Sequence, residues 1–386
     1  MRILHTADWH LGRVLHGVNL ISDQEYVLEQ LIDLAAEARV DAVLIAGDIF
    51  DRSVPPAEAV ALLNRVLTAL WRRTGAQVMI IAGNHDSPER ISFAQELLRE
   101  QRLVMTGTLG KAQMPVVLHD THGPVHFCPL PYAEPAFVRQ AFGDQEALTH
   151  DLAMAGMIKA MMRQIPAEAR TVAVGHAFVA GGMASESERP LTAVGGADQV
   201  DPSRFASFHY TALGHLHRPQ QAGSERIRYA GSLLKYSFSE SDHHKGVTLL
   251  ELDQRGSLLS QEAISLKPRR DLRVLKGTLT ELRRAGENDP ACEDYIKAVL
   301  TDEGALFDPM GKIRSVYPNA LEIERPRFAG SVDAGIPRTD CRRVSDSDLF
   351  AEFFKEVTDA PLSDSETKAV AEAFDAFYRQ EREVER

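Results

Sequence analysis

Short apolar runs alternate with helical patterns through the first hundred residues. Three apolar runs, Arg2–Ala7, Ala42–Ala46 and Val78–Ala82, each end in a polar cluster. Between them, Tyr26–Ala38 and Ala57–Trp71 carry apolar residues at spacings of three and four. This alternation predicts βαβ units, and therefore an α/β fold with parallel strands.

The middle of the chain predicts more strands and one long loop. Further apolar runs that indicate strands are Val125–Leu130, Val172–Val174, Tyr210–Leu213, Ile227–Ala230 and Val247–Leu252. The segment Val179–Asp201 is rich in Gly and Ser and has few periodic apolar residues. We interpret it as a long functional loop.

The pattern changes near Leu266–Asp271, where a second domain is expected to begin. Residues 272–327 predict a small α+β domain, with strands Leu272–Leu275, Tyr295–Thr301 and Leu321–Glu324 and a helix near Leu279–Ala285. A polar stretch at residues 328–343 follows. We expect a domain of residues 1–265, a small α+β domain of residues 272–327, and a helical tail of residues 345–386.

Two apolar stripes at helical spacing mark the tail. The first comprises Leu349, Phe350, Phe353, Phe354 and Val357. The second follows a capping box, Ser363 with Glu366, and comprises Val370, Ala373, Phe374, Phe377 and Tyr378. Packing onto their own domain is the ordinary explanation of such stripes. Their short length and the polar linker before them favour docking in a groove of a partner.

Composition places the chain among ordinary globular proteins. It has 386 residues, of which 44 % are hydrophobic and 25 % charged, and no apolar run approaches the roughly 18 residues of a membrane helix. The start, MRILHTADWH, lacks the pattern of a signal peptide. Three widely spaced cysteines predict neither disulfides nor a thiolate zinc site. A cytoplasmic protein is expected.

The net charge of −12 argues against a protein that coats itself with nucleic acid. Residues 346–386 hold 12 acidic and 5 basic residues, which is more than half of this imbalance. The rest of the chain can therefore still form a local basic groove. Four arginines that closely follow polar clusters are candidates for phosphate contacts, although any single arginine is ordinarily a solvated surface group: Arg13, Arg52, Arg90 and Arg218.

Five polar clusters directly follow predicted strands. They are Asp8-x-His10, Gly47-Asp48-x-x-Asp51, Gly83-Asn84-His85-Asp86, Gly175-His176 and Gly214-His215-x-His217. The carboxyl ends of strands in an open α/β sheet share one edge, so distant clusters can converge there. Imidazole, carboxylate and amide ligands without thiolate suit Mn²⁺, Fe²⁺ or Zn²⁺. A single Gly-His pair is more often a buried structural histidine, but five clusters in this order favour a metal centre. The pair His243-His244 is expected to be solvated in a polar turn.

The number of candidate ligands favours two metal ions. The seven are Asp8, His10, Asp48, Asn84, His176, His215 and His217. With one bridging carboxylate, each ion would have four protein ligands and open positions for water and substrate. Two ions roughly 3.5–4 Å apart suit in-line attack on phosphorus by a bridging hydroxide.

The five clusters together resemble those of the calcineurin-like metallophosphoesterase superfamily. The segments MRILHTADWHLG, VDAVLIAGDIFD, IAGNHDS, YTALGHLHRPQ and RYAGS are similar to the SbcD family, nuclease subunits of the DNA double-strand-break repair branch. These motifs span residues 1–240, and the small domain and tail continue the family's layout. The resemblance implies a metallophosphoesterase β-sandwich flanked by helices, with a small α+β capping domain and a C-terminal helical tail.

The resemblance also implies the role of each site residue. One ion would be held by Asp8, His10, Asp48 and His217. The other would be held by Asp48, Asn84, His176 and His215, with Asp48 bridging. His85 would protonate or stabilise the leaving oxygen, a task that suits a side chain titrating near neutral pH. Asp51 would orient His85; capping of the following turn, SVPP, is the alternative for this residue.

The activity that the resemblance implies is hydrolysis of DNA with two Mn²⁺ ions, or Mg²⁺ as the alternative. It would be an ATP-dependent 3′→5′ exonuclease on double-stranded ends and an endonuclease on hairpins and single strands, in repair, recombination and replication. The partner would be an SbcC-type ATPase with a coiled coil, in a heterotetramer with a homodimer of nuclease subunits. ATP use falls to that partner because this chain has no G-x-x-x-x-G-K-[ST] motif.

Two other functions are compatible with this set of ligands. A metallophosphatase or small-molecule phosphodiesterase would use the same dinuclear core, although the extra domain and helical tail favour the nuclease. A non-catalytic DNA-end scaffold is a third hypothesis. The complete ligand set and His85 argue against it, since a scaffold needs no acid for a leaving group.

Overall fold

The computed structural model describes residues 1–110, 114–143, 146, 148–188, 199–304, 306–325, 347, 350–351, 354–355 and 360–384, with side chains up to residue 374. The predicted positions of Leu349, Phe353 and Val357, and the side chains of Phe377 and Tyr378, lie outside this part. The chain divides into two units. The first comprises Met1–Leu275, Asp289–Lys297 and Tyr317–Glu322, and the second comprises Lys276–Asn288, Ala298–Val316 and Ile323–Arg386.

The first unit contains two six-stranded mixed sheets. The first sheet has the order β16-β15-β1-β4-β5-β6. Its strands are β1 (Arg2–Thr6), β4 (Ala42–Ala46), β5 (Gln77–Ile81), β6 (Leu103–Thr106), β15 (Gly246–Leu252) and β16 (Leu258–Ser265). Strands β1, β4, β5 and β6 are parallel, whereas β15 and β16 run antiparallel to their neighbours.

The second sheet has the order β13-β14-β12-β9-β8-β7. Its strands are β7 (Val116–Asp120), β8 (Gly123–Leu130), β9 (Arg170–His176), β12 (Tyr210–Gly214), β13 (Gln220–Ala222) and β14 (Ser224–Tyr229). The four central strands, β14, β12, β9 and β8, are parallel. Both sheets therefore present a row of parallel strand ends.

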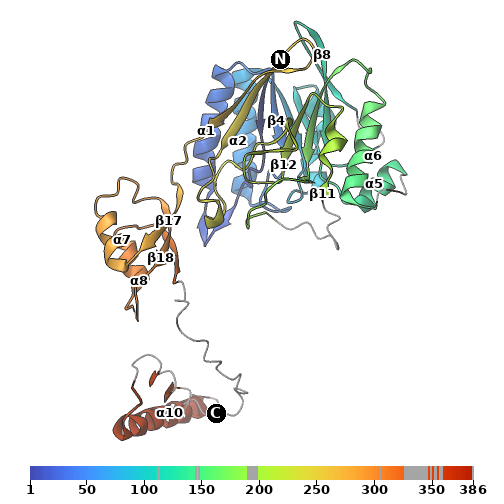
Figure 1. Ribbon diagram of the computed structural model, residues 1–386. Coiled ribbons are helices and arrows are strands. Elements are labelled where there is room, and N and C mark those ends of the chain that lie inside the picture. Colours follow the sequence, from blue (N-terminus) through green and yellow to red (C-terminus); the bar gives the residue numbers. More distant parts are fainter. Residues whose placement is uncertain are drawn as a thin grey trace. The chain divides into compact units, whose positions relative to one another are not determined.

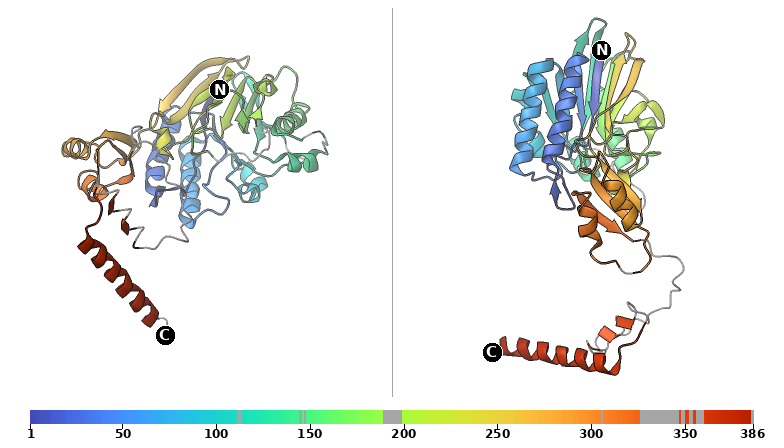
Figure 2. Two further views of the ribbon diagram at one scale, coloured as in Figure 1. Left: turned by 60° about the horizontal axis from the view of Figure 1, so that its bottom comes forward. Right: turned by 90° about the vertical axis from the view of Figure 1, so that its left-hand side faces the viewer.

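The two sheets pack face to face, with helices on their outer faces (Figure 1). A fully buried layer that includes Leu44, Phe127 and Tyr210 lies between the sheets. Helices α1 (Ile21–Glu37) and α2 (Ala57–Thr74) pack on the first sheet and lie side by side (Figure 2). Helices α5 (Pro135–Phe142) and α6 (His150–Met162) cover the second sheet. The predicted α/β sandwich flanked by helices is confirmed.

The predicted strands of the first 252 residues all form, and their ends differ from the predicted ones by at most three residues. Helix α6 was not predicted. Its sequence, HDLAMAGMIKAMM, buries Met154, Met157 and Met161, but it is apolar on most of its circumference and so lacks the contrast that marks an amphipathic helix. Helix α5 and strands β6, β7, β13 and β16 were not predicted either.

Short elements complete the first unit. They are β2 (Val14–Leu15), β3 (Val18–Asn19), α3 (Pro88–Ile91), α4 (Gln95–Arg99), β10 (Phe178–Val179), β11 (Gln199–Val200), and the 3-10 turns η1 (Pro202–Phe205) and η2 (Phe238–Glu240). In the predicted loop Val179–Asp201, the described residues include the end of β10 and all of β11.

A three-stranded sheet, β17-β18-β19, follows the sandwich. Its elements are β17 (Leu272–Gly277), α7 (Leu279–Gly286), β18 (Tyr295–Leu300), α8 (Pro309–Arg314) and β19 (Ala320–Glu324). The predicted strands and the helix near Leu279–Ala285 are confirmed, and α8 is an addition.

The last helix, α10 (Asp364–Val384), begins at the predicted capping box. The Ser363 backbone N–H donates to Glu366 Oε2 over 2.8 Å, and the Glu366 N–H donates to Ser363 Oγ over 3.4 Å. The ring of Phe350 contacts those of Phe354 and Phe374 at centroid distances of 6.5 and 6.3 Å. Within the described part of the chain, no helix combines the length and apolarity needed to span a membrane.

Candidate metal centre

All five polar clusters lie at the carboxyl ends of parallel strands, as the alternation predicted. They follow β1, β4 and β5 in the first sheet and β9 and β12 in the second. Face-to-face packing brings the two rows of strand ends to one edge of the sandwich. The seven predicted ligands gather there.

The backbone at this edge is strained. Asp8, His10, Asp48 and His215 have φ angles of 52°, 45°, 51° and 110°. This left-handed region is costly for side chains other than glycine, at about 1–3 kcal/mol each, and such residues cluster at functional sites. The turns thus place four candidate ligands in positions that ordinary strand geometry does not allow.

Two glycines allow the loops to approach closely. Gly47 has φ +88°, and a Cβ there would lie 2.3 Å from His176 Nδ1. A Cβ on Gly83 would lie 2.1 Å from Asp48 Oδ1. The glycines of the GD and GNHD motifs therefore leave the space that Asp48 and His176 occupy.

His10, His217 and Asp48 form the first group of candidate ligands. The Nε2 atoms of His10 and His217 face each other at 3.0 Å, and His10 Nε2 lies 3.6 Å from Asp48 Oδ2. Two imidazoles that share one ion, each with a bond of about 2.1 Å, also place their nitrogens about 3 Å apart. This spacing fits a shared cation.

His176, His215 and Asn84 form the second group. Asn84 Oδ1 lies 3.0 Å from both His176 Nε2 and His215 Nδ1. His176 Nε2 is 3.5 Å from Asp48 Oδ2. Asp48 Oδ2 therefore lies between the two groups, which is the location that a bridging carboxylate requires.

Asp8 completes the centre. Its Oδ1 accepts the backbone N–H of His215 over 2.9 Å, whereas its Oδ2 is buried and has no hydrogen-bond partner among the residues that the structure describes. Ligand atoms of Asp8, Asp48 and His176 lie within 4.8 Å of one another. An orphaned carboxylate oxygen in a buried site is costly unless a cation meets it.

Burial also sets the protonation of the centre. It lowers the pKa of His215 to about 3 and lowers the pKa of His10 and His176, so these imidazoles are neutral, as metal ligands must be. Burial and the neighbouring Asp48 raise the pKa of Asp8. A pair of divalent cations would reverse that shift and compensate both carboxylates, so the residues fit a dinuclear centre.

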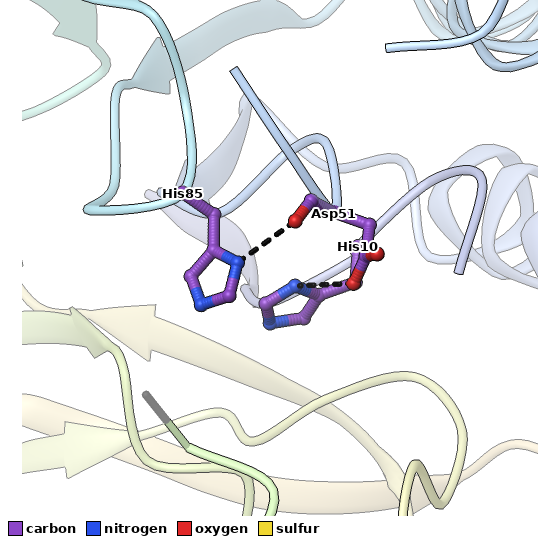
Figure 3. A group of neighbouring side chains, drawn as sticks. All are labelled: His10, Asp51 and His85. Atoms are coloured by element: carbon purple, nitrogen blue, oxygen red, sulfur yellow. Dashed lines mark hydrogen bonds and ion pairs between the residues drawn. The ribbon is translucent and has the colours of Figure 1, made fainter. Parts of the chain in front are cut away.

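His85 lies beside this centre and makes a different set of contacts (Figure 3). Its ring meets that of His10 edge to face at 4.7 Å, and its backbone N–H donates to Asp48 Oδ1 over 2.9 Å. Its Nδ1 donates to the backbone carbonyl oxygen of Asp51 over 2.9 Å. This contact leaves Nε2 available to meet a substrate.

The Asp51 carboxylate points away from His85. Its Oδ1 accepts from an Arg13 guanidinium nitrogen over 2.8 Å and lies 3.7 Å from His10 Nδ1. The contact with His85 comes from the main chain of Asp51, whereas the predicted orienting role belonged to the side chain. His10, Asp51 and His85 also have ligand atoms within 4.8 Å of one another.

Two residues that the sequence did not identify as functional, Asp86 and Gln24, form hydrogen bonds that position the loops carrying the candidate ligands. The backbone N–H groups of Ile49, Phe50 and Gly83 donate to Asp86 over 2.9–3.0 Å, which joins the GDIF and GNHD turns. Gln24 of α1 donates to the carbonyl oxygen of His10 over 2.8 Å. Asp86 stands inside a recognised motif, but nothing local identifies the function of Gln24.

A buried carboxylate, Glu240, orients His217. His217 Nδ1 lies 3.2 Å from Glu240 Oε1 and 2.8 Å from Ser187 Oγ, which itself donates to Glu240. Lys245 Nζ pairs with Glu240 Oε2 at 2.5 Å. Burial opposes ionisation of Glu240, but His217 and Lys245 hold its pKa below the usual range. Glu188 accepts the His217 backbone N–H over 2.7 Å.

Replacing Glu240 by alanine is expected to weaken Mn²⁺ binding about 10- to 100-fold at one of the two sites. The reason is that the carboxylate behind a ligating histidine fixes its tautomer and orientation. Titration with Mn²⁺, followed by electron paramagnetic resonance, measures the two affinities. Asp242→Ala, on the same turn but 66 % exposed, is the control and should leave both unchanged. Equal affinities in Glu240→Ala and wild type would contradict this role.

Two other sequence predictions have different outcomes. His243 is buried against Glu240 and Lys245, so its predicted solvation was wrong; His244 is exposed, as predicted. The reason is that η2 turns the chain inward beside Glu240.

Arg218 pairs with Asp242 at 2.9 Å, whereas Arg52 and Arg90 are exposed. Phosphate contacts by these arginines stay a prediction.

Comparison with known proteins places this geometry in a family. Residues 1–219 match the family described as calcineurin-like phosphoesterase, and residues 268–358 match the type 5 capsule protein repressor C-terminal domain. The chain is 33 % identical to the SbcD subunit of nuclease SbcCD from Staphylococcus epidermidis, over 94 % of this chain and 95 % of the relative. It is 32 % identical to the SbcD subunit of nuclease SbcCD from Staphylococcus saprophyticus, over 98 % of both chains.

Among solved structures, the protein TT1561 of Thermus thermophilus is 13 % identical with a TM-score of 0.40, covering 69 % of this chain and 99 % of that one.

Proposed function

Since the chain belongs to the SbcD family of nuclease subunits, within the calcineurin-like phosphoesterases, we propose that it hydrolyses phosphodiester bonds in DNA at the dinuclear centre. The observation that carries the proposal is the pair of buried carboxylates, Asp8 and Asp48, between four histidines and an asparagine. Two divalent ions, Mn²⁺ or alternatively Mg²⁺, would activate a water and neutralise charge on the scissile phosphate.

The residues of the chain have separate roles in the proposed reaction. Asp48 would belong to both metal sites, with His10, His217 and Asp8 on one side and Asn84, His176 and His215 on the other. His85 would give a proton from Nε2 to the leaving oxygen, while its Nδ1 stays bound to the Asp51 carbonyl. The strained turns hold these groups in place before substrate arrives.

The family relationship supports a more specific assignment. We propose an ATP-dependent 3′→5′ exonuclease on double-stranded ends that also cuts hairpins and single strands, in repair, recombination and replication. Its partner would be an SbcC-type ATPase, in a heterotetramer built on a dimer of nuclease subunits. Residues 272–327 would cap the active site and steer DNA.

A substrate comparison tests this function. Purified protein with Mn²⁺ should cleave single-stranded and hairpin DNA, and addition of the ATPase subunit and ATP should extend cleavage to duplex ends. Para-nitrophenyl phosphate and its bis ester report the alternative function, a phosphatase or small-molecule phosphodiesterase. Turnover of these esters without cleavage of any DNA would overturn the proposal in favour of that alternative.

Removing residues 345–386 is expected to leave a metal-loaded nuclease that cuts short single strands but no longer responds to ATP on duplex ends. Every candidate ligand lies before residue 218, and the tail would dock on the partner's coiled coil. Size-exclusion chromatography with the ATPase subunit measures complex formation. Phe350→Glu should weaken the complex and Phe350→Leu should preserve it. Loss of bound metal on truncation would instead place the tail in the core.

Because the family resemblance implies a homodimer of nuclease subunits, we propose that a second copy of the chain covers an apolar groove beside α2 and α4. The groove has a volume of about 550 Å³, and Trp71 and Phe93 on its walls are 48 % and 78 % exposed. Aromatic side chains exposed together mark interaction surfaces. Phe93→Glu should therefore convert a dimer to a monomer in light scattering. The matched change on an exposed residue of β16, Leu259→Glu, should leave the dimer intact, and a monomeric wild type would contradict this assignment.

A further inference from the structure

A cavity of about 590 Å³ opens beside the candidate metal centre. Asn84, placed above in the second metal site, is also part of its wall. Other lining residues that bear on its chemistry are Glu89, Tyr132, Glu134, Phe137 and Gln140. Ligand sites typically have volumes of about 300–1,000 Å³ and a mostly apolar lining with a few polar groups. The cavity has that size and that mixture.

Its aromatic wall is exposed on one side and firmly held on the other. Phe137 is 63 % exposed, although the next residue of α5, Val138, is fully buried and anchors the helix. The Tyr132 hydroxyl donates to Glu134 over 2.7 Å, its backbone N–H donates to Ala82 over 2.9 Å, and its ring stacks on His150 at 5.6 Å. The cavity therefore has a fixed aromatic side and an open aromatic platform.

The polar groups of the wall would repel a phosphate and accept hydrogen bonds from a neutral ligand. None of the described residues that line the cavity is Lys or Arg, while Glu89 and Glu134 contribute carboxylates. Asp86 also lines it, but its oxygens already accept three backbone N–H groups. Carboxylates accept hydrogen bonds from the exocyclic amino groups of bases, and aromatic side chains stack on base rings.

We propose that this cavity, the base pocket, holds an unstacked nucleobase next to the scissile phosphate. The inference rests on the proposed function. Because Asn84 belongs both to the metal centre and to the pocket wall, the phosphate at the metals and a neighbouring base in the pocket can be held together. The base stacks on Phe137 and Tyr132, and Glu89 and Glu134 face its amino groups. Aromatic stacking makes the site tolerant of sequence.

A cycle of variants and abasic substrates tests the pocket. The substrate is a short single strand, either intact or with an abasic sugar on one side or the other of the mapped cleavage position, and the protein is the full chain with Mn²⁺. In wild type, an abasic sugar on one of the two sides should lower kcat/KM about 10- to 100-fold. Phe137→Ala should lose a similar factor on the intact strand and almost nothing further on that abasic strand.

Three controls keep the result specific. Phe137→Trp retains an aromatic platform and should recover most of the activity that Phe137→Ala loses on the intact strand. Leu259→Ala, at a 67 % exposed position on β16, should keep the full abasic effect. Mn²⁺ titration of Phe137→Ala should show two ions bound with unchanged affinity.

The possible failures are distinguishable. The base pocket is overturned if Phe137→Ala and the abasic sugar lower kcat/KM independently, so that their factors multiply. It is also overturned if Phe137→Ala cleaves the intact strand with full activity. In both cases the proposed nuclease function stands. If Phe137→Ala cleaves normally but loses the ATPase subunit, the cavity is a protein-docking surface instead. Absence of any DNA cleavage by wild type overturns both the proposed function and the pocket.

Discussion

Asp48→Asn is expected to abolish cleavage and to leave the protein without stably bound metal at either site. Asp48 Oδ2 lies 3.6 Å from His10 Nε2 and 3.5 Å from His176 Nε2, so its charge serves both groups of ligands. Asparagine tolerates the left-handed backbone that Asp48 adopts at φ 51°, and its Oδ1 can still accept the His85 N–H. The substitution thus removes the charge and preserves the shape.

Metal analysis combined with Mn²⁺ titration measures this effect. His217→Ala is the comparison, because it removes a ligand from one site only and should leave the second ion largely in place. Circular dichroism should show that both variants are folded. If Asp48→Asn retains two ions while His217→Ala loses both, then Asp48 does not bridge the metals.

His85→Gln and His85→Ala are expected to lower cleavage about 10²- to 10⁴-fold, the usual contribution of a positioned general acid. Both ions should remain bound, because His85 is assigned to the leaving group and the seven other residues supply the ligands. Single-turnover cleavage of a single-stranded substrate measures the rate, and Mn²⁺ titration measures occupancy. Loss of one ion in His85→Ala would make His85 a ligand.

Asp51→Asn distinguishes orientation of His85 by the main-chain carbonyl oxygen of Asp51 from orientation by the Asp51 carboxylate. The His85 Nδ1 contact uses the Asp51 carbonyl oxygen, which this substitution retains, and the carboxylate instead pairs with Arg13. Asp51→Asn is therefore expected to lower the cleavage rate much less than His85→Ala does. A loss as large as that of His85→Ala would restore the carboxylate to the orienting role that the family resemblance implied.

Most of the fold was readable from local pattern. Strand β4, and β5 after its first residue, are continuous apolar runs because both faces of a parallel sheet are covered. Helices α1 and α2 show a clear polar face because only one side packs. Helix α6 escaped prediction for the opposite reason, since a helix that is apolar nearly all round has no periodic contrast. The pairing of the strands into two sheets had no local signal at all.

The candidate metal centre also combines residues that local sequence indicated with contacts that only packing determined. Its seven candidate ligands stand in short motifs directly after strands, and parallel strand ends meet at one edge, so the motifs alone indicated which residues converge. The residues behind them are dispersed along the chain: Glu240 and Lys245 follow His217 by more than twenty positions, and Ser187 precedes it by thirty. Ser187 follows β10, His217 follows β12 and Glu240 lies on η2, so their contacts exist only once these separate elements have packed, and no spacing in the sequence encodes that arrangement.

Local sequence thus specified the chemistry of this protein, because ligand type and strand-end position are properties of a few adjacent residues. Three-dimensional packing decided the contacts of these residues. His85 binds a main-chain carbonyl oxygen of Asp51, a buried ion pair lies behind His217, and an aromatic cavity lies beside Asn84. These features depend on distances between side chains from separate elements, and such distances exist only once the sandwich has closed.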